Sequence, residues 1–465
     1  MKGTIATLAI AMLLSSCAVG PNYKRPAVQV PEQFRAADSP ASEKSLADLK
    51  WFELFEDDVL KQLVTTALQQ NFDLRIAAER VLQARAQLGV TRSDQFPTIN
   101  ATGEFVAQRG SSIGQIVFIP RGTNLDVSYT QAGFTLGWEL DVWGRLRRLT
   151  ESARAQYLAS EEARHGVITT LISDVTSTYF AIRELDLELD IARKTRTIAQ
   201  DSLRLTQLRR DQGAATGLDV RQAEQLLYTA SAQIASAERE LGQTENALSL
   251  LLGRSPGDIE RGKALVDFKA PPEVPAGLPS ALLERRPDIR QAERVLISAN
   301  AEIGAARAQY FPQISLTGLL GAQSRALTDL FTGPARSWNF SPGAVLPIFN
   351  AGRIRSTVRF TEAQKREAVI SYEKAIQNAF REVSDALIGY RKTAEQRTQQ
   401  ELLVEALRET ERLSMLRYRG GTDSYLQVLD AQRNLFDGQL TLARLRQQEL
   451  VSVVQLYRAL GGGWS

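Results

Sequence analysis

Cys17 is the residue of this 465-residue chain whose type and position indicate a specific chemistry. Lys2 supplies a positive charge, an apolar stretch follows at 4–14, and two serines at 15–16 come directly before the cysteine. This order is typical of a lipoprotein signal, in which the peptide 1–16 is removed and Cys17 is acylated. The alternative is an ordinary signal peptide that contains a cysteine. Because the chain has a single cysteine, we expect a covalent lipid on it, no disulfide within one chain, and no other cofactor.

The residues after the cysteine indicate the compartment. Ala18 follows it, and the absence of Asp at this position favours sorting to the outer membrane. The mature chain has no apolar run of roughly 18 residues, the length that a transmembrane helix needs. If the chain spans a membrane, it must do so as part of a closed barrel, because a bilayer satisfies no open sheet edge.

The sequence shows no catalytic or metal-binding pattern. His165 is the single histidine, and we interpret it as a surface or wall residue of a helix. There is no Cys/His metal spacing, no phosphate-binding Gly-Lys-Ser/Thr loop and no nucleophile elbow. The carboxylates at 184–190 are interpreted as a solvated helix face. A net charge of +3 also gives no reason to expect nucleic-acid binding. We predict that the protein is not an enzyme, has no metal site, and depends on a partner for energy.

The chain contains an internal repeat, the first feature to seek in a sequence of this length. The matching segments are Asn71–Arg75 with Arg286–Arg290, Phe96-Pro97 with Phe311-Pro312, Gly144-Arg145 with Gly352-Arg353, and Leu252-Gly253 with Leu460-Gly461. Two helical hairpins without common origin would not explain the matching strand regions. The predicted parts are the signal peptide 1–16, an extended lipidated segment 17–50, a first repeat 51–269, a proline-rich linker 270–279 and a second repeat 280–465.

Each repeat begins with an amphipathic helix that ends at Phe-Pro, and two strand-like stretches follow. Apolar and polar residues alternate at 98–108, 131–139, 314–323 and 338–341. This alternation is typical of a membrane barrel strand, although a soluble hairpin gives the same pattern. Pro342 weakens the last strand, because proline cannot donate to the ladder. The stretches 111–124 and 325–337 are expected to be loops that face outside the cell.

Long helices are expected next, at 150–211 and 352–418, because neither stretch contains a proline. Each would extend about 90–100 Å, at 1.5 Å per residue. One apolar stripe predicts coiled-coil packing, and its members are Ile168, Ile172, Val175, Tyr179, Ile182 and Leu189. Glycine-rich turns at 213–217 and 420–424 end these helices, and returning helices are expected at about 218–252 and 425–460.

Several segments resemble the TolC-like outer-membrane factor family, specifically its lipoprotein branch, which is OprM-like and NodT-like. They are Cys17–Tyr23, Trp51-Phe52, Leu283–Arg290, Pro347–Phe349 before Gly352-Arg353, and Tyr425–Gln432. The resemblance implies a fold that is mainly α with membrane β. Four strands per chain would form one 12-stranded barrel in a homotrimer, continued by an α-helical coiled-coil periplasmic tunnel with a mixed α/β equatorial belt. Four strands alone are also too few to close a barrel with a lumen.

The resemblance implies the outer-membrane channel of a tripartite efflux system. The channel would be anchored by its lipid in the outer membrane and would pass drugs, metals or other small toxic solutes outward. Its partners would be two further copies, a periplasmic adaptor, an inner-membrane pump and outer-membrane lipid. The alternatives are an exit duct for protein secretion and a structural periplasmic coiled-coil lipoprotein.

By resemblance, Leu426 and Asp430 form a gate near the periplasmic tip of the tunnel. They lie four residues apart and therefore share a helix face. In a trimer, a leucine ring would narrow the pore and a carboxylate ring would favour cations. The alternative is a seam leucine and a solvated aspartate. The expected adaptor contacts are Gly213, Gly217, Gly421, Thr422 and Asp423, although Asp423 could instead cap the following helix.

Overall fold

The structure, a computed structural model, describes residues 18–35, 45–111, 124–269 and 275–463. Cys17, on which the lipidation prediction rests, lies outside the described residues. The same is true of most of the first expected outer loop, at 112–123, and of 270–274 in the expected linker.

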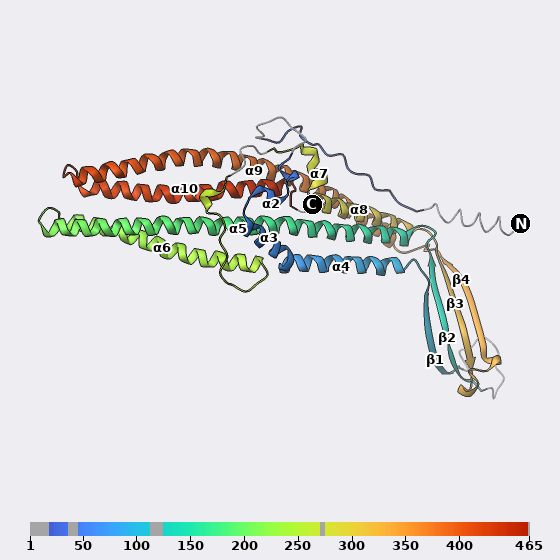
Figure 1. Ribbon diagram of the computed structural model, residues 1–465. Helices are drawn as coiled ribbons and strands as arrows, with labels where there is room; N and C mark the ends of the chain where they lie inside the picture. Colours follow the sequence, from blue (N-terminus) through green and yellow to red (C-terminus); the bar gives the residue numbers. More distant parts are fainter. Residues whose placement is uncertain (1–17, 36–44, 112–123, 270–274, 464–465) are drawn as a thin grey trace. The chain divides into compact units, whose positions relative to one another are not determined.

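The two halves of the chain have the same order of elements (Figure 1). The first half contains α4 (Phe72–Ser93), β1 (Thr98–Arg109), β2 (Asp126–Leu140), α5 (Arg145–Asp211) and α6 (Gly217–Leu251); the second contains α8 (Pro287–Ala308), β3 (Gln313–Ser324), β4 (Arg336–Val345), α9 (Arg353–Arg419) and α10 (Tyr425–Ala459). Equivalent helices have equal lengths: 22 residues in α4 and α8, 67 in α5 and α9, and 35 in α6 and α10.

Short elements join these parts. They are η1 (Leu46–Asp48), α2 (Trp51–Leu54), α3 (Asp58–Gln70), η2 (Leu265–Asp267), η3 (Pro279–Ala281), α7 (Leu282–Arg285), η4 (Leu327–Asp329) and η5 (Gly333–Ala335).

The first long helix begins earlier than the predicted residue 150. The reason is that the carboxylate of Asp141 accepts hydrogen bonds from the backbone N–H groups of Leu146 and Arg147, at 2.9 and 2.8 Å. Such bonds satisfy donors that a helix start leaves unpaired. The second outer loop also ends before residue 336, where β4 begins.

The four strands form one antiparallel sheet in the order β1-β2-β3-β4. Within the first half Thr98 pairs with Gly137, and the equivalent residues of the second half, Gln313 and Val345, form the same pair. The register therefore follows the sequence repeat. Pro342 lies within β4, opposite Leu316 of β3. Among the described residues β4 is an edge of the sheet, which is where a strand accommodates proline.

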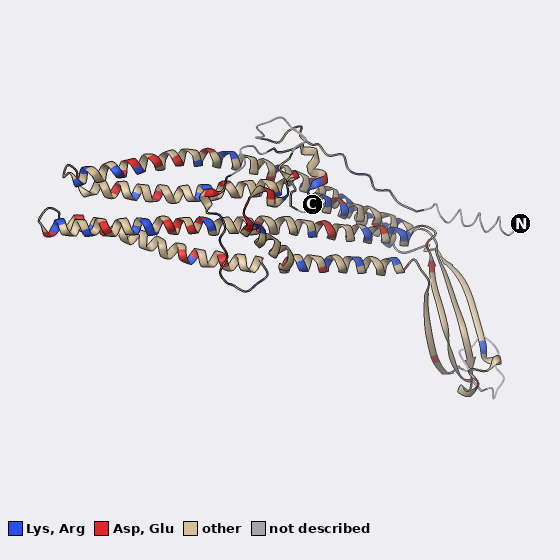
Figure 2. Ribbon diagram, in the orientation of Figure 1, with Lys and Arg blue, Asp and Glu red and all other residues tan. Residues whose placement is uncertain are grey.

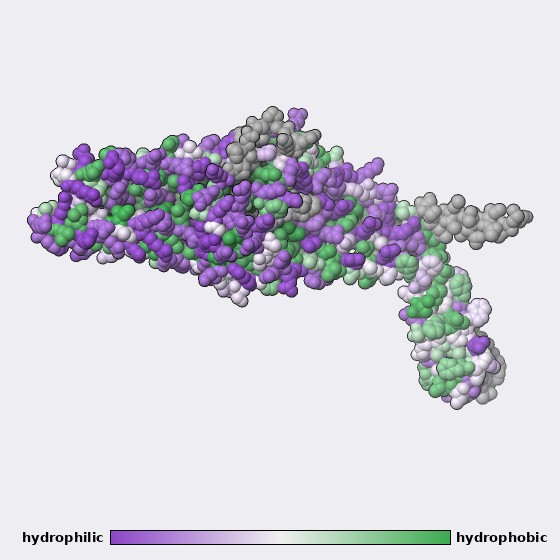
Figure 3. All heavy atoms as spheres, viewed as in Figure 1, coloured by the Kyte–Doolittle hydropathy of each residue, from purple (hydrophilic) through white to green (hydrophobic). Residues whose placement is uncertain are grey.

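The strands differ in chemistry from the helices. Charged residues in the strands lie at or next to strand ends, with the exception of Glu104. Figure 2 shows the contrast with the helices, along which acidic and basic residues are frequent. On the face seen in Figure 3, the strands are mostly white to green and the helices mostly purple. A sheet with few charges and exposed apolar side chains suits a lipid environment.

The folded chain divides into two compact units, each built from both halves of the sequence. The first contains Met1–Pro26, Leu82–Ala159 and Glu293–Ser371, and so includes the sheet. The second contains Ala27–Val81, Ser160–Ala292 and Tyr372–Ser465, and so includes both long hairpins. No helix of the described chain has both the length and the apolar content that a membrane crossing requires.

The apolar stripe of α5 lies in the core of the second unit. Its members Ile172, Val175, Tyr179, Ile182 and Leu189 are all buried, whereas Ile168 is half-buried. The predicted packing seam is therefore confirmed. A 67-residue helix needs such a seam, because most helical stability in proteins comes from burying an apolar face.

Equivalent polar residues connect each first helix to the end of a returning helix. The Asn71 amide donates to the carbonyl oxygen of Leu251 at 2.9 Å, near the end of α6. At the equivalent place the Arg286 guanidinium donates to the carbonyl oxygen of Ala459 at 2.9 Å, at the end of α10. Arg286 also forms an ion pair with Glu382 of α9 at 2.7 Å. The Arg-Arg-Pro-Asp segment thus has a structural role that joins three helices.

The segment after Cys17 is bound to the first unit. The N–H of Val19 donates to the carbonyl oxygen of Trp143 at 3.0 Å. Gly20 has a φ of +104° and lies against Gly304, where an added Cβ would collide with the backbone. Further along, Arg25 forms an ion pair with Glu293 at 2.7 Å. These contacts hold residues 19–25 in a defined position within the sheet-bearing unit.

We predict that Arg286→Ala lowers the free energy of unfolding by about 2–3 kcal/mol, because it removes the hydrogen bond to Ala459 and the 2.7 Å ion pair with Glu382. Thermal unfolding of the protein in detergent, followed by circular dichroism, measures the change. Arg85→Ala, at an exposed position of α4, is the control and should change stability by less than about 0.5 kcal/mol. Equal melting temperatures for both variants would contradict the assigned role of Arg286.

Candidate functional site at the hairpin tips

Each long hairpin ends in a turn built around a glycine with a left-handed backbone. Gly213 has a φ of +73° and Gly421 a φ of +76°. In both turns the residue after the glycine forms a backbone hydrogen bond to the last turn of the long helix. Ala214 N–H donates to the carbonyl oxygen of Arg209 at 2.7 Å, and Thr422 N–H donates to that of Arg417 at 3.1 Å. This arrangement is the glycine-containing helix end that both turn sequences predict. No atom lies within 4 Å of a Cβ built on either glycine, so the turns are open to a neighbour.

The two turns start their returning helices differently. Thr216 caps α6 and forms a capping box with Asp219. Ser424 occupies the cap position of α10 and makes no side-chain cap bond. Asp423 instead pairs with Arg417 at 2.6 Å, and the hydrogen bond from this guanidinium lowers the pKa of Asp423. The alternative that Asp423 caps α10 is therefore wrong. Its carboxylate instead links the turn to the end of α9 through Arg417.

A buried apolar cluster connects the tips of the two hairpins. We call it the tip cluster; its buried members are Ala199, Ala223, Leu226, Tyr418, Tyr425, Val428 and Leu429. The rings of Tyr418 and Tyr425 meet edge to face with centroids 5.4 Å apart. The guanidinium of Arg209, from α5, lies 4.4 Å from the centre of the Tyr418 ring. Burial raises the pKa of Tyr425 to about 12, so this phenol stays neutral in the cluster.

Leu426 and Asp430 lie on the exposed face of α10, while Tyr425 and Leu429 face the tip cluster. The Leu426 side chain is 50% exposed and the Asp430 side chain 59% exposed. Asp430 accepts a hydrogen bond from Asn434 at 3.2 Å and lies 3.8 Å from Arg433. Both predicted gate residues therefore share one accessible helix face, and neither belongs to the intramolecular core.

Two carboxylates further along α5 are buried, so the expectation of a solvated face at 184–190 is wrong for them. Glu184 is 9% exposed and Glu188 is 3% exposed. Glu188 forms an ion pair with Arg444 of α10 at 2.8 Å and accepts a hydrogen bond from Gln233 of α6 at 2.9 Å. Burial, helped by the charge of Glu188, raises the pKa of Glu184 to about 8. Arg444 thus balances the charge of Glu188, and Glu184 retains a proton at neutral pH.

The sequence pattern did not predict the burial of Glu184 and Glu188, because charged residues on a helix usually face solvent. The available signal was spacing: Glu184 and Glu188 lie next to the seam residues Ile182, Leu185 and Leu189. The Tyr418–Tyr425 pair also had a signal, since two tyrosines flank the glycine turn.

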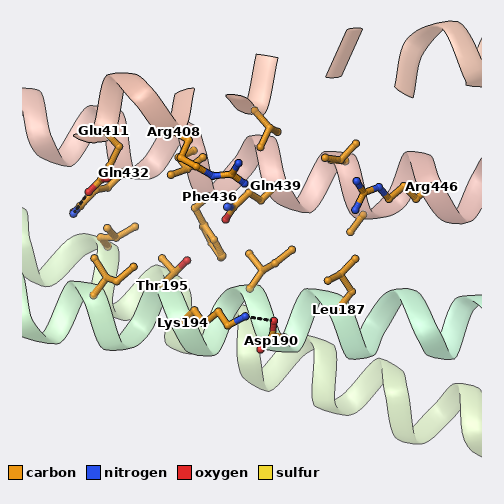
Figure 4. Close-up of a pocket in the computed structure, with 17 residues that line it drawn as sticks. Leu187, Asp190, Lys194, Thr195, Arg408, Glu411, Gln432, Phe436, Gln439 and Arg446 are labelled. Atoms are coloured by element: carbon orange, nitrogen blue, oxygen red, sulfur yellow. Dashed lines mark hydrogen bonds and ion pairs between the residues drawn. The ribbon is translucent and has the colours of Figure 1, made fainter. Parts of the chain in front are cut away.

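A groove of about 390 Å³ lies between α5 and the pair α9 and α10 (Figure 4). Apolar side chains such as Leu187 and Phe436 form its walls. On α5, Lys194 pairs with Asp190 at 2.6 Å, and across the groove Gln432 donates to Glu411 at 3.2 Å. The groove is open and mixed in charge, and no group of acidic, histidine or cysteine residues in the described chain is arranged to hold a metal.

A sheet with few charges combined in one chain with long helical hairpins defines a class of protein, the outer-membrane channels with a periplasmic helical part. The family model for outer membrane efflux proteins matches residues 63–254 and 278–462. The solvent efflux pump outer membrane protein SrpC of Pseudomonas putida is 41% identical over 460 residues, which cover 98% of this chain and 97% of that protein. The cation efflux system protein CusC of Escherichia coli K12 is 36% identical and covers 98% of each chain.

A solved structure shows the same fold. The open state of the MtrE outer membrane channel of Neisseria gonorrhoeae is 31% identical, with a TM-score of 0.86 over 97% of this chain and 99% of that chain. The chain belongs to the outer membrane efflux protein family. It is an outer-membrane channel component of an efflux system and not an enzyme, as predicted, and the predicted fold class is confirmed.

The buried carboxylates generate a prediction on pH. Because the folded chain binds the Glu184 proton more tightly than the unfolded chain, whose carboxyl has a pKa near 4.5, stability falls as the pH rises from about 4.5 to about 8 and then levels off. Glu184→Gln stays neutral and removes this loss. Its melting temperature should match that of the wild type near about pH 5, exceed it by a margin that grows up to about pH 8, and keep that margin at higher pH.

The matched control is Asp190→Asn, which changes an exposed carboxylate of the same helix and should leave the pH profile unchanged in shape. Melting curves in detergent across this pH range provide the comparison. Parallel profiles for Glu184→Gln and the wild type would show that Glu184 holds no extra proton.

Proposed function

We propose that this chain is the passive exit channel of a tripartite efflux system, which receives small toxic solutes from a pump and an adaptor and releases them outside the cell. The observation that carries the proposal is the presence, in one chain, of a sheet suited to lipid and of 67-residue helices suited to a water-filled compartment. The lipid expected on Cys17 would anchor the chain in the outer membrane.

Three copies would form the working channel. The sheet of one chain has two free edges, β1 and β4. Unpaired edges are not tolerated in hydrocarbon, and four strands cannot enclose a lumen. A closed barrel of 12 strands from three chains satisfies both requirements and leaves room for a passage.

The hairpin tips would contact the periplasmic adaptor. The proposed contact residues are Gly213, Gly217, Gly421, Thr422 and Asp423. Supporting observations are the open space around the two turn glycines and Gly217, and the exposed backbone of both turns. The Arg417–Asp423 pair would present a fixed pair of charges beside the second turn.

The channel would not select its solute. The names of the relatives refer to solvents in one case and cations in another, although the chains share more than a third of their residues with this one. A shared conduit fits this range best if the pump and the adaptor choose the solute. We therefore propose drugs, metals or other small toxic solutes as cargo, as a class.

Removal of the gene should increase susceptibility to the solutes that the system exports, and the wild-type chain should restore resistance. Asp423→Arg, which places two guanidinium groups side by side at the second tip, should restore resistance only in part and weaken capture of the adaptor about tenfold. Asp201→Arg, at an exposed position of α5, is the control. Resistance and adaptor capture equal to wild type for Asp423→Arg would contradict the assigned tip contact.

Leu426 and Asp430 would form the periplasmic gate. Both side chains project from one accessible face of α10, and neither belongs to the tip cluster. In a three-fold assembly each becomes a ring, a leucine ring that narrows and dewets the passage and a carboxylate ring that attracts cations. The first hairpin has Leu218 and Gln222 at the equivalent places, so the carboxylate ring would belong to the second hairpin alone.

Leu426→Ala should raise single-channel conductance in a planar bilayer, and Asp430→Ala should raise conductance and lower cation selectivity. Gln222→Asp is the matched gain of function, because it places a carboxylate at the equivalent position of the first hairpin and should increase cation selectivity. The gate assignment fails if Leu426→Ala and Asp430→Ala leave both conductance and ion selectivity unchanged.

A further inference from the structure

The two faces of the sheet carry different side chains. Successive residues of a strand point to opposite faces, and the pairing register shows which residues of neighbouring strands share a face. Every asparagine and glutamine of the four strands lies on one face, which we call the polar face, and every phenylalanine and tryptophan lies on the other, which we call the apolar face. The polar face carries Asn100, Gln108, Gln131, Gln313, Gln323 and Asn339, and the apolar face carries Phe105, Phe134, Trp138, Trp338 and Phe340.

Glu104 lies midway along β1 on the polar face, and it is exposed. It pairs with Gln131 of β2, which in turn pairs with Gln323 of β3, so three polar side chains form one row across the sheet. In the adjoining row of the same face Gly133 pairs with Gly321. Neither of these two residues has a side chain that could cover the Glu104 carboxylate.

The strands contain three carboxylates, and Glu104 differs from the other two in its surroundings. Asp126, at the start of β2, pairs with Arg109 at 3.2 Å. Glu139, next to the end of β2, pairs with Arg145 at 2.7 Å. In the part of the chain that the structure describes, Glu104 forms no ion pair. A charge in the middle of a strand is unfavourable when it faces hydrocarbon, so this carboxylate indicates that the polar face is wet.

The polar face also lacks an opposite charge that could neutralise Glu104. The two basic residues of the strands, Arg109 and Arg336, both lie on the apolar face. By the sequence repeat Glu104 corresponds to Leu319, which lies on the polar face of β3. The first half of the chain therefore supplies a carboxylate at this level and the second half does not.

We propose that Glu104 gives the strand part of the passage a preference for cations over anions. The inference rests on the proposed assembly of three copies around a water-filled lumen, which the polar face would line. Three copies would place three Glu104 carboxylates at one level. Carboxylates arranged in this way in a passage with low-dielectric walls concentrate cations and repel anions.

Glu104 would act separately from the proposed gate. Glu104 belongs to the first compact unit and Asp430 to the second. Each would contribute its own preference for positive charge. This preference concerns the sign of the charge alone, and the identity of the solute would still depend on the pump and the adaptor.

Ion selectivity in a planar bilayer tests the proposal. Glu104→Gln keeps the size and polarity of the side chain and removes its charge, so it should lower the cation-to-anion permeability ratio about twofold at about 0.1 M KCl. The difference from the wild type should largely disappear at about 1 M KCl, where the screening length is about 3 Å. A change in the width of the passage would persist at both salt concentrations, which separates lost charge from altered structure.

Three further variants serve as comparisons. Asp126→Asn removes a paired carboxylate of the apolar face and should leave the permeability ratio unchanged. Leu319→Glu adds a carboxylate to the polar face at the position equivalent to Glu104 and should raise the ratio. Glu104→Gln combined with Asp430→Ala should lower the ratio by the product of the two single effects, because the two residues belong to different compact units.

Thiol labelling tests which face meets water. Glu104→Cys should react with a charged, water-soluble thiol reagent, and the reaction should lower the conductance. Phe105→Cys, the neighbouring residue on the apolar face, should react with a lipid-soluble maleimide and resist the charged reagent. The wild-type chain, whose Cys17 is expected to carry lipid, gives the background of both reactions.

The outcomes separate this inference from the proposed function. A wild-type permeability ratio for Glu104→Gln at low salt, in a protein that conducts, would overturn the role of Glu104 and leave the proposed exit channel in place. Modification of Glu104→Cys by the lipid-soluble reagent alone would overturn that role as well, because the polar face would then not line water. Absence of conductance from the wild-type protein would overturn both the inference and the proposed function.

Discussion

A strand in hydrocarbon must pair the N–H and C=O groups of its backbone, because no water is present to replace a missing partner. This chain satisfies that constraint along three ladders of its own sheet and leaves two edges for another molecule. The two free edges, β1 and β4, are the reason why we propose further copies in the working channel. The sparse charge of the strands suits the same lipid environment. The helices carry no such constraint, since each of their interior backbone groups pairs within the helix.

The sequence repeat explains why the two halves of the chain have the same order of helices and strands, and differences between the two halves explain why their polar contacts differ. Equal helix lengths and a common strand register keep the halves geometrically equivalent. Yet Asn71 and Arg286 make equivalent contacts with different charge, and the two turns use different helix caps. The two halves therefore share a backbone arrangement but differ in the charged side chains that they carry.

The second compact unit depends on polar contacts as well as apolar seams. The Glu188–Arg444 ion pair joins the first hairpin to the second, and the neighbouring Glu184 carries its proton because a second charge would have no cation to balance it. At the tips the same connection is made by aromatic packing, in the tip cluster and the Arg209–Tyr418 contact. Both kinds of contact position α10, and hence the face that presents Leu426 and Asp430.

The sequence by itself determined the repeat, the strands and long hairpins, the glycine turns and the apolar seam of α5, because these depend on local periodicity and on the backbone freedom of glycine. It also indicated that Leu426 and Asp430 share a face. Only the tertiary structure decided which charges are buried. Glu184 and Glu188 have the composition of a solvated helix face, and their burial arises because α6 and α10 pack over them. Likewise Asp423 pairs with Arg417 rather than capping α10, because the path of the turn brings the guanidinium to its carboxylate.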